Sequence, residues 1–336
     1  MFLTYYVYSL FLPMLIITSL MIFVSNSWIS MWMIMEMNMI TFIMMMNFDK
    51  MNLISNLINY FFIQTGSSYV FLMSSMFMDL NNSFFFLIYM MITFSLFVKL
   101  SIFPFHLWMM NIVNKLNWMN IFMLLTTQKL IPLIILMKIY QKNLYLLLTF
   151  LIMIINMYFA ALFSFNLSNL KILMMYSSMI QNSWMIILLL ISENLFIKYY
   201  FVYLFIMLNL SMMFYKLNIF SLNSLKLNYL SNKKILLKFS ILIFSLMGVP
   251  PFIGFSLKIY SIEMFSNFSL MIFSILMIIV SVISMFFYMR MILNIFMFKF
   301  LNIKFFMFNK LTFSKSMNFT LLNLILLSIL ILLNFF

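Results

Sequence analysis

The 336-residue chain is 67% hydrophobic and only 7% charged, with a formal net charge of +14. Soluble domains use roughly 45–50% apolar and about 25% charged residues, so a soluble globular protein is excluded, and basic residues spread thinly between apolar runs argue against nucleic-acid binding. With no cysteine and a single histidine, the sequence lacks the ligands for an iron–sulfur cluster, a haem pair or a zinc site, so we expect no cofactor and no metal on this chain.

Long apolar runs divide the chain into about eleven candidate membrane-spanning helices, each near the roughly 20 residues that a span requires. The predicted fold is therefore an all-α polytopic membrane protein without a soluble domain. The predicted spans cover residues 2–24, 27–46, 57–78, 84–110, 121–140, 144–164, 168–191, 195–217, 237–264, 267–290 and 317–336.

The second predicted span carries Glu36 near its middle, in the segment WMIMEMN. A charged side chain at a helix centre costs roughly 2.5–3.5 kcal/mol on insertion scales, and such residues usually face the bundle interior or a hydrated cavity. Glu36 is thus a candidate for ion transport. The alternatives are a structural ion pair or a protonated, hydrogen-bonded acid.

The fourth predicted span is interrupted by Pro104, with Lys99 and His106 on either side of it in KLSIFPFH. Proline lacks a backbone N–H and displaces the carbonyl about one turn earlier, so the break exposes polar groups that need water or side chains. Lys99 indicates a hydrated site at this break, unless the helix is only kinked. His106 is either a proton relay or a packing residue.

The fifth predicted span places Lys129 near its centre, in TTQKLIP, too deep for the side chain to reach either interface easily. Desolvation disfavours the charged form of a buried amine, so we expect Lys129 to gain and lose a proton near neutral pH. The alternative is a permanently charged lysine that is paired with a carboxylate of a neighbouring subunit.

The seventh predicted span has polar residues along MMYSSMIQNSW, among them Tyr176, Ser177 and Ser178. Hydroxyl and amide groups at this depth are suited to hold a file of water molecules. They also serve as ordinary hydrogen bonds between membrane helices, so both interpretations stay open.

The ninth predicted span contains GVPPFIGFSLK, which holds two of the three glycines and two of the five prolines of the chain. A break at membrane depth is tolerable only where water or protein satisfies the freed backbone groups. We expect Gly248, Pro250, Pro251 and Gly254 to break this helix and Lys258 to add a titratable group at a hydrated site. Alternatively, Lys258 extends to the nearby membrane interface.

The basic residues between the spans are distributed unevenly: thirteen fall on one side, and only Lys138, Lys142 and Lys198 on the other. Because basic loops stay on the side of synthesis, this predicts the N-terminus in the matrix and the C-terminus in the intermembrane space. A composition rich in Met, Phe, Ile, Asn and Lys is typical of an A/T-rich mitochondrial genome, and the N-terminus lacks a transit-peptide character. We therefore expect a multi-pass protein of the mitochondrial inner membrane.

The two proline breaks occupy matching positions if the spans are grouped in fives. The first unit would cover residues 1–142 and the second, with a following loop, residues 143–316, before a last helix at 317–336. Each break then lies in the fourth helix of its unit, and an odd number of spans gives the units inverted topology. Interrupted spans at matching positions of inverted repeats indicate an ion pathway.

Six segments resemble the subunit 2 family of mitochondrial NADH:ubiquinone oxidoreductase (respiratory complex I) in its short animal form, which is antiporter-like and related to cation/proton antiporters. The matching segments are WMIMEMN (32–38), YFFIQTGSS (60–68), KLSIFPFHLW (99–108), LLTTQKLIPL (124–133), NLKILMMYSSMIQNSW (169–184) and GVPPFIGFSLK (248–258). They extend over most of the chain in the expected order. The resemblance implies two inverted five-helix units in a single transmembrane domain.

By matched position, the resemblance implies that Glu36 and Lys99 form an ion pair at one end of a proton path, that Lys129 is the central carrier and that Lys258 is the group on the outlet side. It also implies that His106, Ser177 and Ser178 line the hydrated axis between the carriers. The sequence departs from the family at three positions, which put local water access and an extra relay in doubt. These are Ile34, Ser101 and Asn111.

The expected function is that of a proton-translocating core subunit of the membrane arm, and thus of a subunit of an NADH:ubiquinone reductase. Its partners would be other membrane-arm subunits, including neighbouring antiporter-like subunits, and lipids, with no nucleic acid. FMN, iron–sulfur clusters and ubiquinone are expected on partner subunits. Two alternatives remain: a stand-alone cation/proton antiporter, and a structural membrane-arm subunit without its own proton path.

Overall fold

The computed structural model describes residues 2–47, 54–78, 85–140, 146–222, 224, 233–267 and 271–301, which are helical nearly throughout. Within these residues no β-strand forms, although Asn169 and Ser221 make an isolated bridge, and the all-α prediction is confirmed. Six helices in the described ranges are long and apolar enough to cross a membrane. They are Trp28–Asn47, Trp118–Ile139, Leu147–Ser164, Leu170–Ile191, Glu193–Leu217 and Met271–Leu293.

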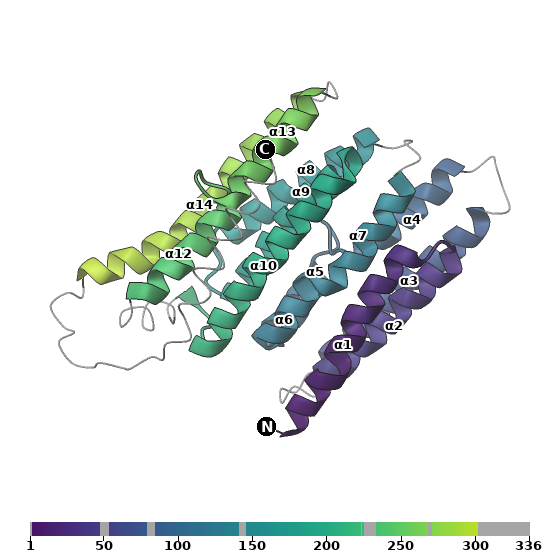
Figure 1. Cartoon of the computed structure of the whole chain (residues 1–336), viewed down its shortest axis with the longest axis horizontal. Helices are drawn as coiled ribbons and strands as arrows, with labels where there is room; N and C mark the ends of the chain where they lie inside the picture. Colours follow the sequence, from purple (N-terminus) through teal and green to yellow (C-terminus); the bar gives the residue numbers. More distant parts are fainter. Residues whose placement is uncertain are drawn as a thin grey trace. The chain divides into compact units, whose positions relative to one another are not determined.

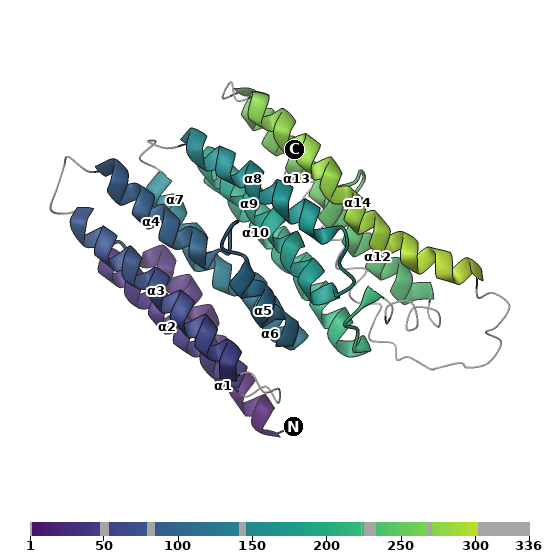
Figure 2. The same ribbon diagram turned by 180° about the vertical axis from the view of Figure 1, so that it is seen from behind.

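The chain divides into two compact units, of which the first comprises Met1–Ala160 and Met174–Glu193. Helices α1, α2 and α3 lie side by side within it, α3 packs on α4, and α7 packs on α1, α2 and α4 (Figures 1 and 2). Its helices are α1 (Phe2–Val24), α2 (Trp28–Asn47), α3 (Ile54–Met78), α4 (Phe85–Lys99), α5 (Leu107–Lys115), α6 (Trp118–Leu125) and α7 (Thr127–Tyr140), with most of α8 (Leu146–Ser164) and of α9 (Leu170–Ile191).

The second unit comprises Ala161–Leu173 and Asn194–Phe336. Helices α12, α13 and α14 pack against one another within it. Its helices are α10 (Glu193–Leu217), α12 (Lys233–Met247), α13 (Ile253–Asn267) and α14 (Met271–Leu301). The predicted last span, 317–336, lies outside the described residues.

Two predicted spans are interrupted where the prolines lie. The fourth is divided into α4 and α5, and the ninth into α12 and α13. The peptide bonds Phe103–Pro104 and Pro250–Pro251 are cis. Ser101, in the first interruption, has a φ of 55°, a left-handed conformation that favours glycine.

A third interruption was not predicted. Thr126 has φ −120° and ψ −78° and separates α6 from α7. Its hydroxyl donates a hydrogen bond to the Phe122 carbonyl at 2.6 Å, and that of Thr127 donates to the Met123 carbonyl at 3.0 Å. Such back-bonding of threonine to the preceding turn bends helices. In the sequence, the pair of threonines before Lys129 is the feature that accompanies this interruption.

Large apolar side chains are exposed on α3 and α14. Examples are Phe62 (66% exposed), Met73 (61%), Ile272 (74%) and Phe286 (63%). Exposed apolar surface of this extent, on helices long enough to span, is what a lipid environment accepts and water does not.

Candidate functional site

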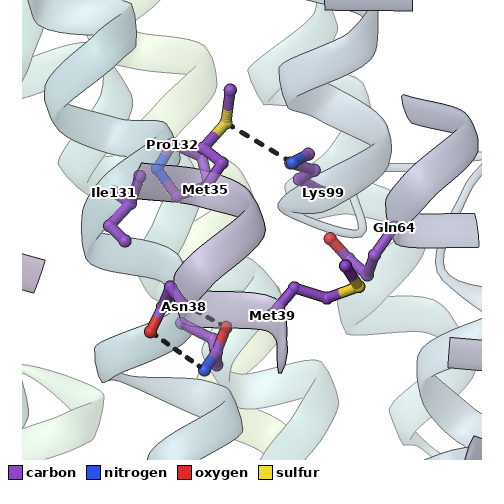
Figure 3. Close-up of a pocket in the computed structure, with 8 residues that line it drawn as sticks. Met35, Asn38, Met39, Gln64, Lys99, Ile131 and Pro132 are labelled. Carbon is purple, nitrogen blue, oxygen red and sulfur yellow. Dashed lines mark hydrogen bonds between the residues drawn. The ribbon is translucent and has the colours of Figure 1, made fainter. Parts of the chain in front are cut away.

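Glu36 and Lys99 lie on adjacent parts of the first unit but bond to different partners. The Ser68 hydroxyl on α3 donates a hydrogen bond to the Glu36 carboxylate on α2. The Lys99 ammonium, at the end of α4, lies 3.4 Å from the sulfur of Met35 (Figure 3). Glu36 and Lys99 interact electrostatically, without an ion pair within 4.0 Å between these two described residues. The pair that the resemblance implies is therefore separated in this structure.

Lys129 is the most deeply buried of the candidate carriers, with 3% of its side chain exposed. Its ammonium donates a hydrogen bond to the Ser178 hydroxyl on α9 at 2.9 Å. With the Asn182 amide oriented to satisfy its hydrogen bonds, the amide oxygen accepts from Lys129 at 2.8 Å and its nitrogen donates to the Ser178 carbonyl at 3.2 Å. Lys129 thus bonds to neutral groups that accept a hydrogen bond without fixing a charge on the lysine.

The interruption at Thr126 lies three residues before Lys129, and Pro132 lies three residues after it. Because Pro132 has no N–H, the carbonyl of Gln128 loses its donor within the helix. Lys129 is therefore surrounded by irregular backbone, as Lys99 and Lys258 are. The sequence interpretation predicted Lys129 but missed the helix irregularity at Thr126 beside it.

His106 stacks in a row of aromatic rings at the first interruption. Its ring centroid lies 5.7 Å from that of Phe103 and 6.0 Å from that of Tyr176 on α9, and its side chain is 5% exposed. The Tyr176 hydroxyl lies 3.1 Å from the sulfur of Met110. Ser177 donates to the Met174 carbonyl of its own helix at 2.7 Å. Of the predicted polar segment MMYSSMIQNSW, Ser178 and Asn182 bond Lys129.

Asn156 on α8 was not singled out in the sequence, yet it is fully buried and joins three segments. Its oxygen accepts a hydrogen bond from the N–H of Phe103, inside the first interruption, at 2.9 Å. Its nitrogen donates to the Met179 carbonyl at 3.2 Å and to the Ser183 hydroxyl at 2.8 Å, both on α9. One amide thus satisfies backbone that the break has freed and ties it to the helix that holds Ser178.

Lys258 in the second unit is 7% exposed and its ammonium donates to the Met247 carbonyl at 2.7 Å. The helical donor to that carbonyl would be residue 251, which is a proline, so Lys258 replaces the missing N–H. Met247 is also the last residue of α12, where the helix dipole favours a cation. Lys258 therefore turns inward to the break, and the alternative in which it extends to the membrane interface is not the conformation found.

The two glycines of this segment let α12 and α13 approach closely. Gly248 has a φ of +74°, and a Cβ there would lie 2.9 Å from Cδ and 3.0 Å from Nζ of Lys258. A Cβ at Gly254, which lies just inside α13, would collide with the backbone carbonyl of Ser245. Both positions therefore require glycine, one for conformation and one for space.

Buried lysines beside interrupted, apolar helices are typical of ion-translocating membrane proteins of the antiporter type. Residues 53–284 match the family model described as NADH:quinone oxidoreductase/Mrp antiporter, transmembrane. The chain belongs to this family and, within it, to the group of NADH-ubiquinone oxidoreductase chain 2. The resemblance drawn from the sequence segments is confirmed.

Relatives support this assignment, and a solved structure shares the fold. NADH-ubiquinone oxidoreductase chain 2 of Artemia franciscana is 32% identical over 264 residues, which are 79% of this chain and 82% of that protein. The protein of the same name from Anopheles gambiae is 29% identical over 86% of each chain. A chain of respiratory complex I from Thermus thermophilus matches in fold with a TM-score of 0.72 at 16% identity, covering 91% of this chain and 72% of that one.

Proposed function

We propose that the chain is a proton-translocating, antiporter-like core subunit of the membrane arm of NADH:ubiquinone oxidoreductase. It couples the transfer of electrons from NADH to ubiquinone, in other subunits, to proton pumping. The observation that carries the proposal is Lys129: a buried lysine that bonds to the hydroxyl of Ser178 and the amide of Asn182. Such an environment lets an amine lose its proton and regain it.

We assign the carrier roles to Glu36, Lys99, Lys129 and Lys258, with His106, Tyr176, Ser177 and Ser178 in support. When Lys99 is held by Glu36, its charge is compensated; when it leaves Glu36, its repulsion makes proton loss from Lys129 more favourable. Two facts support the assignment. Glu36 and Lys99 are already bonded to separate partners, Ser68 and Met35, and each lysine lies beside irregular backbone.

No redox centre is assigned to this chain, and FMN, iron–sulfur clusters and ubiquinone are assigned to partner subunits. The sequence has no cysteine and one histidine, and no group of three or more His, Cys, Asp or Glu side chains converges in the described ranges. The lack of cysteine supports placing the iron–sulfur clusters on partner subunits, and no step of the mechanism passes through any of these groups here. The partners include other membrane-arm subunits, neighbouring antiporter-like subunits among them.

We further propose a single transmembrane domain of about eleven spans in the mitochondrial inner membrane, with the N-terminus in the matrix and the C-terminus in the intermembrane space. Residues 1–142 and 143–316 would form inverted five-helix units, and 317–336 a last helix. The arrangement is supported by a proline-containing interruption in each half, between α4 and α5 and between α12 and α13.

Replacement of Lys129 by Met in the intact complex tests the proposal. Because a positioned proton carrier typically contributes 10²–10⁴-fold to transfer, proton flux through this chain is expected to fall about 100-fold or more. Protons pumped per NADH oxidised, measured in sealed vesicles, report this loss. Lys198→Met, the same change at an exposed lysine of α10, is the matched control. An unchanged ratio in fully assembled Lys129→Met complex removes Lys129 from the path.

A further inference from the structure

Gln64 on α3 belongs to the segment YFFIQTGSS, to which the proposed mechanism gives no role. Its side chain is 8% exposed and faces a cavity next to Lys99 (Figure 3). Among the residues that the structure describes, none hydrogen-bonds to the side-chain amide of Gln64. Buried amides in folded proteins have hydrogen-bond partners, so a polar ligand at this position is indicated.

The cavity is of the right size and polarity for one water molecule. It offers about 20 Å³ to the centre of a water molecule, and about 10–15 Å³ is sufficient for one. Four of its lining side chains are polar, and a buried water typically makes two to four hydrogen bonds. The polar lining residues are Asn38, Gln64, Lys99 and Gln128.

Asn38 and Gln128 form a fixed wall of this cavity. Asn38 Nδ2 donates to Gln128 Oε1 at 3.1 Å, and Gln128 Nε2 donates to Asn38 Oδ1 at 3.4 Å. Each amide oxygen accepts a second hydrogen bond, from Tyr60 at 3.3 Å and from Thr18 at 3.3 Å respectively. The Thr18 hydroxyl also donates to the Leu15 carbonyl at 3.0 Å, so its one hydrogen is shared between two acceptors. Each amide nitrogen keeps one more N–H with which to bond a ligand in the cavity.

Gln64 is different, because its oxygen is not used by any of these groups. A water molecule that accepts from Lys99 or from an amide N–H needs an acceptor for its own hydrogens, and the Gln64 oxygen is suited to that role. We propose that Gln64 is a positioning residue: together with Asn38 and Gln128 it holds one water molecule against Lys99. The lysine then has a second hydrogen-bond partner when it is not held by Glu36.

This inference rests on the proposed function in one respect, namely that Lys99 changes partners during turnover. A map of the intact complex at a resolution that shows ordered water tests the site by itself. Density for one water within hydrogen-bond distance of Gln64 and of Lys99 is expected, and it is expected to vanish in Gln64→Met. A dry cavity, or a Gln64 amide bonded to protein, overturns the proposal whatever the pumping activity is.

The role of Gln64 in turnover is tested by measuring the protons pumped and the NADH oxidised by the assembled complex. Gln64→Met has nearly the same length without the amide, so the alternative position of Lys99 loses its partner and coupled turnover is expected to fall about tenfold. Gln64→Asn keeps an amide and is expected to recover part of that loss. Thr65→Val is the control on the same helix, because the Thr65 hydroxyl bonds to the Phe61 carbonyl of its own helix.

The outcomes separate the two proposals. If water is present and Lys99→Met pumps normally, the role of Lys99 fails while the water site stands. If Lys99→Met stops pumping and assembled Gln64→Met pumps normally, the positioning role of Gln64 is wrong while the proposed function stands.

Discussion

Individual prolines and their substitute donors explain why charged side chains lie beside the helix breaks. Pro251 cannot donate to the Met247 carbonyl, and Lys258 does so instead. Pro104 likewise cannot donate to the Leu100 carbonyl, which accepts from the Ser101 hydroxyl at 2.6 Å. At the break near Pro104, a neutral hydroxyl is therefore sufficient to satisfy the carbonyl that the proline leaves without a donor. The lysine at the other break adds a cationic group that a serine does not, which is consistent with the carrier role proposed for Lys258.

Because little space surrounds Gly248, we expect a methyl group added at this position to have a strong effect. Gly248→Ala combines a left-handed backbone, which costs a non-glycine residue about 1–2 kcal/mol, with a Cβ only 2.9 Å from Cδ of Lys258. We expect the lysine to leave the Met247 carbonyl, and both the assembled fraction and the proton-to-NADH ratio to fall. Native gels and pumping assays measure these two quantities.

Gly66→Ala is the matched control, because nothing lies within 4 Å of a Cβ built there, in the middle of α3. Alanine is expected to stabilise that helix by about 0.5–1 kcal/mol. If both glycine variants behave alike, the contact between Gly248 and Lys258 is unimportant.

At Ser101, the free-energy cost of the left-handed backbone and the gain from the hydroxyl hydrogen bond oppose each other. Ser101→Gly relieves the left-handed cost of about 1 kcal/mol but loses the hydroxyl bond to Leu100, worth about 0.5–1.5 kcal/mol, so little net change is expected. Ser101→Ala keeps the cost, loses the bond and is expected to destabilise by about 1 kcal/mol. Heat inactivation of the purified complex ranks the variants. An alanine variant more stable than the glycine variant contradicts this account.

At the scale of the helical elements, Asn156 connects α8, the break between α4 and α5, and α9. Asn156→Leu leaves the Phe103 N–H without its acceptor in a buried site, at a cost of about 1–3 kcal/mol, and removes two further bonds. We expect a clear loss of assembled complex on native gels. Asn209→Leu is the control, because Asn209 bonds to the Phe205 carbonyl of its own helix at 2.9 Å. Equal loss in both variants argues against a connecting role.

The elements differ in how far the sequence predicts them. The interruptions near Pro104 and Pro250 were predictable, because a proline removes a donor wherever it stands. The interruption at Thr126 was not, because threonine is compatible with a helix and bends it only where its hydroxyl bonds to the preceding turn.

Within the site, the charged residues and the neutral Ser178 were predictable, whereas Asn156 and Gln64 were not. Glu36, Lys99 and Lys129 are conspicuous in apolar runs because charge is costly there. Asn156 and Gln64 resemble many other amides in this sequence, and only their burial and surroundings distinguish them. The sequence also left open whether the Lys258 side chain points inward to the helix break or outward to the membrane interface, because an ammonium group can be solvated at either place.

For the whole molecule, the absence of native cysteine makes the proposed orientation directly testable. Asn26→Cys, between α1 and α2, is expected to react with a membrane-impermeant maleimide from the intermembrane space. Asn114→Cys, in the last turn of α5, is expected to react from the matrix. Both side chains are exposed, and the unmodified chain is the blank. The reverse labelling pattern inverts the orientation that the loop charges predict.

The contact of Lys138 with α1 forms late during synthesis, because its donor and acceptors are far apart in the sequence. The Lys138 ammonium donates to the Ile22 carbonyl at 2.8 Å and to the Ser25 carbonyl, at and beyond the end of α1. These acceptors leave the ribosome more than a hundred residues before their donor. The carbonyls at the end of α1 therefore lack this donor until α7 has been synthesised, and truncated nascent chains that stop before Lys138 should hold α1 less firmly than those that extend beyond it.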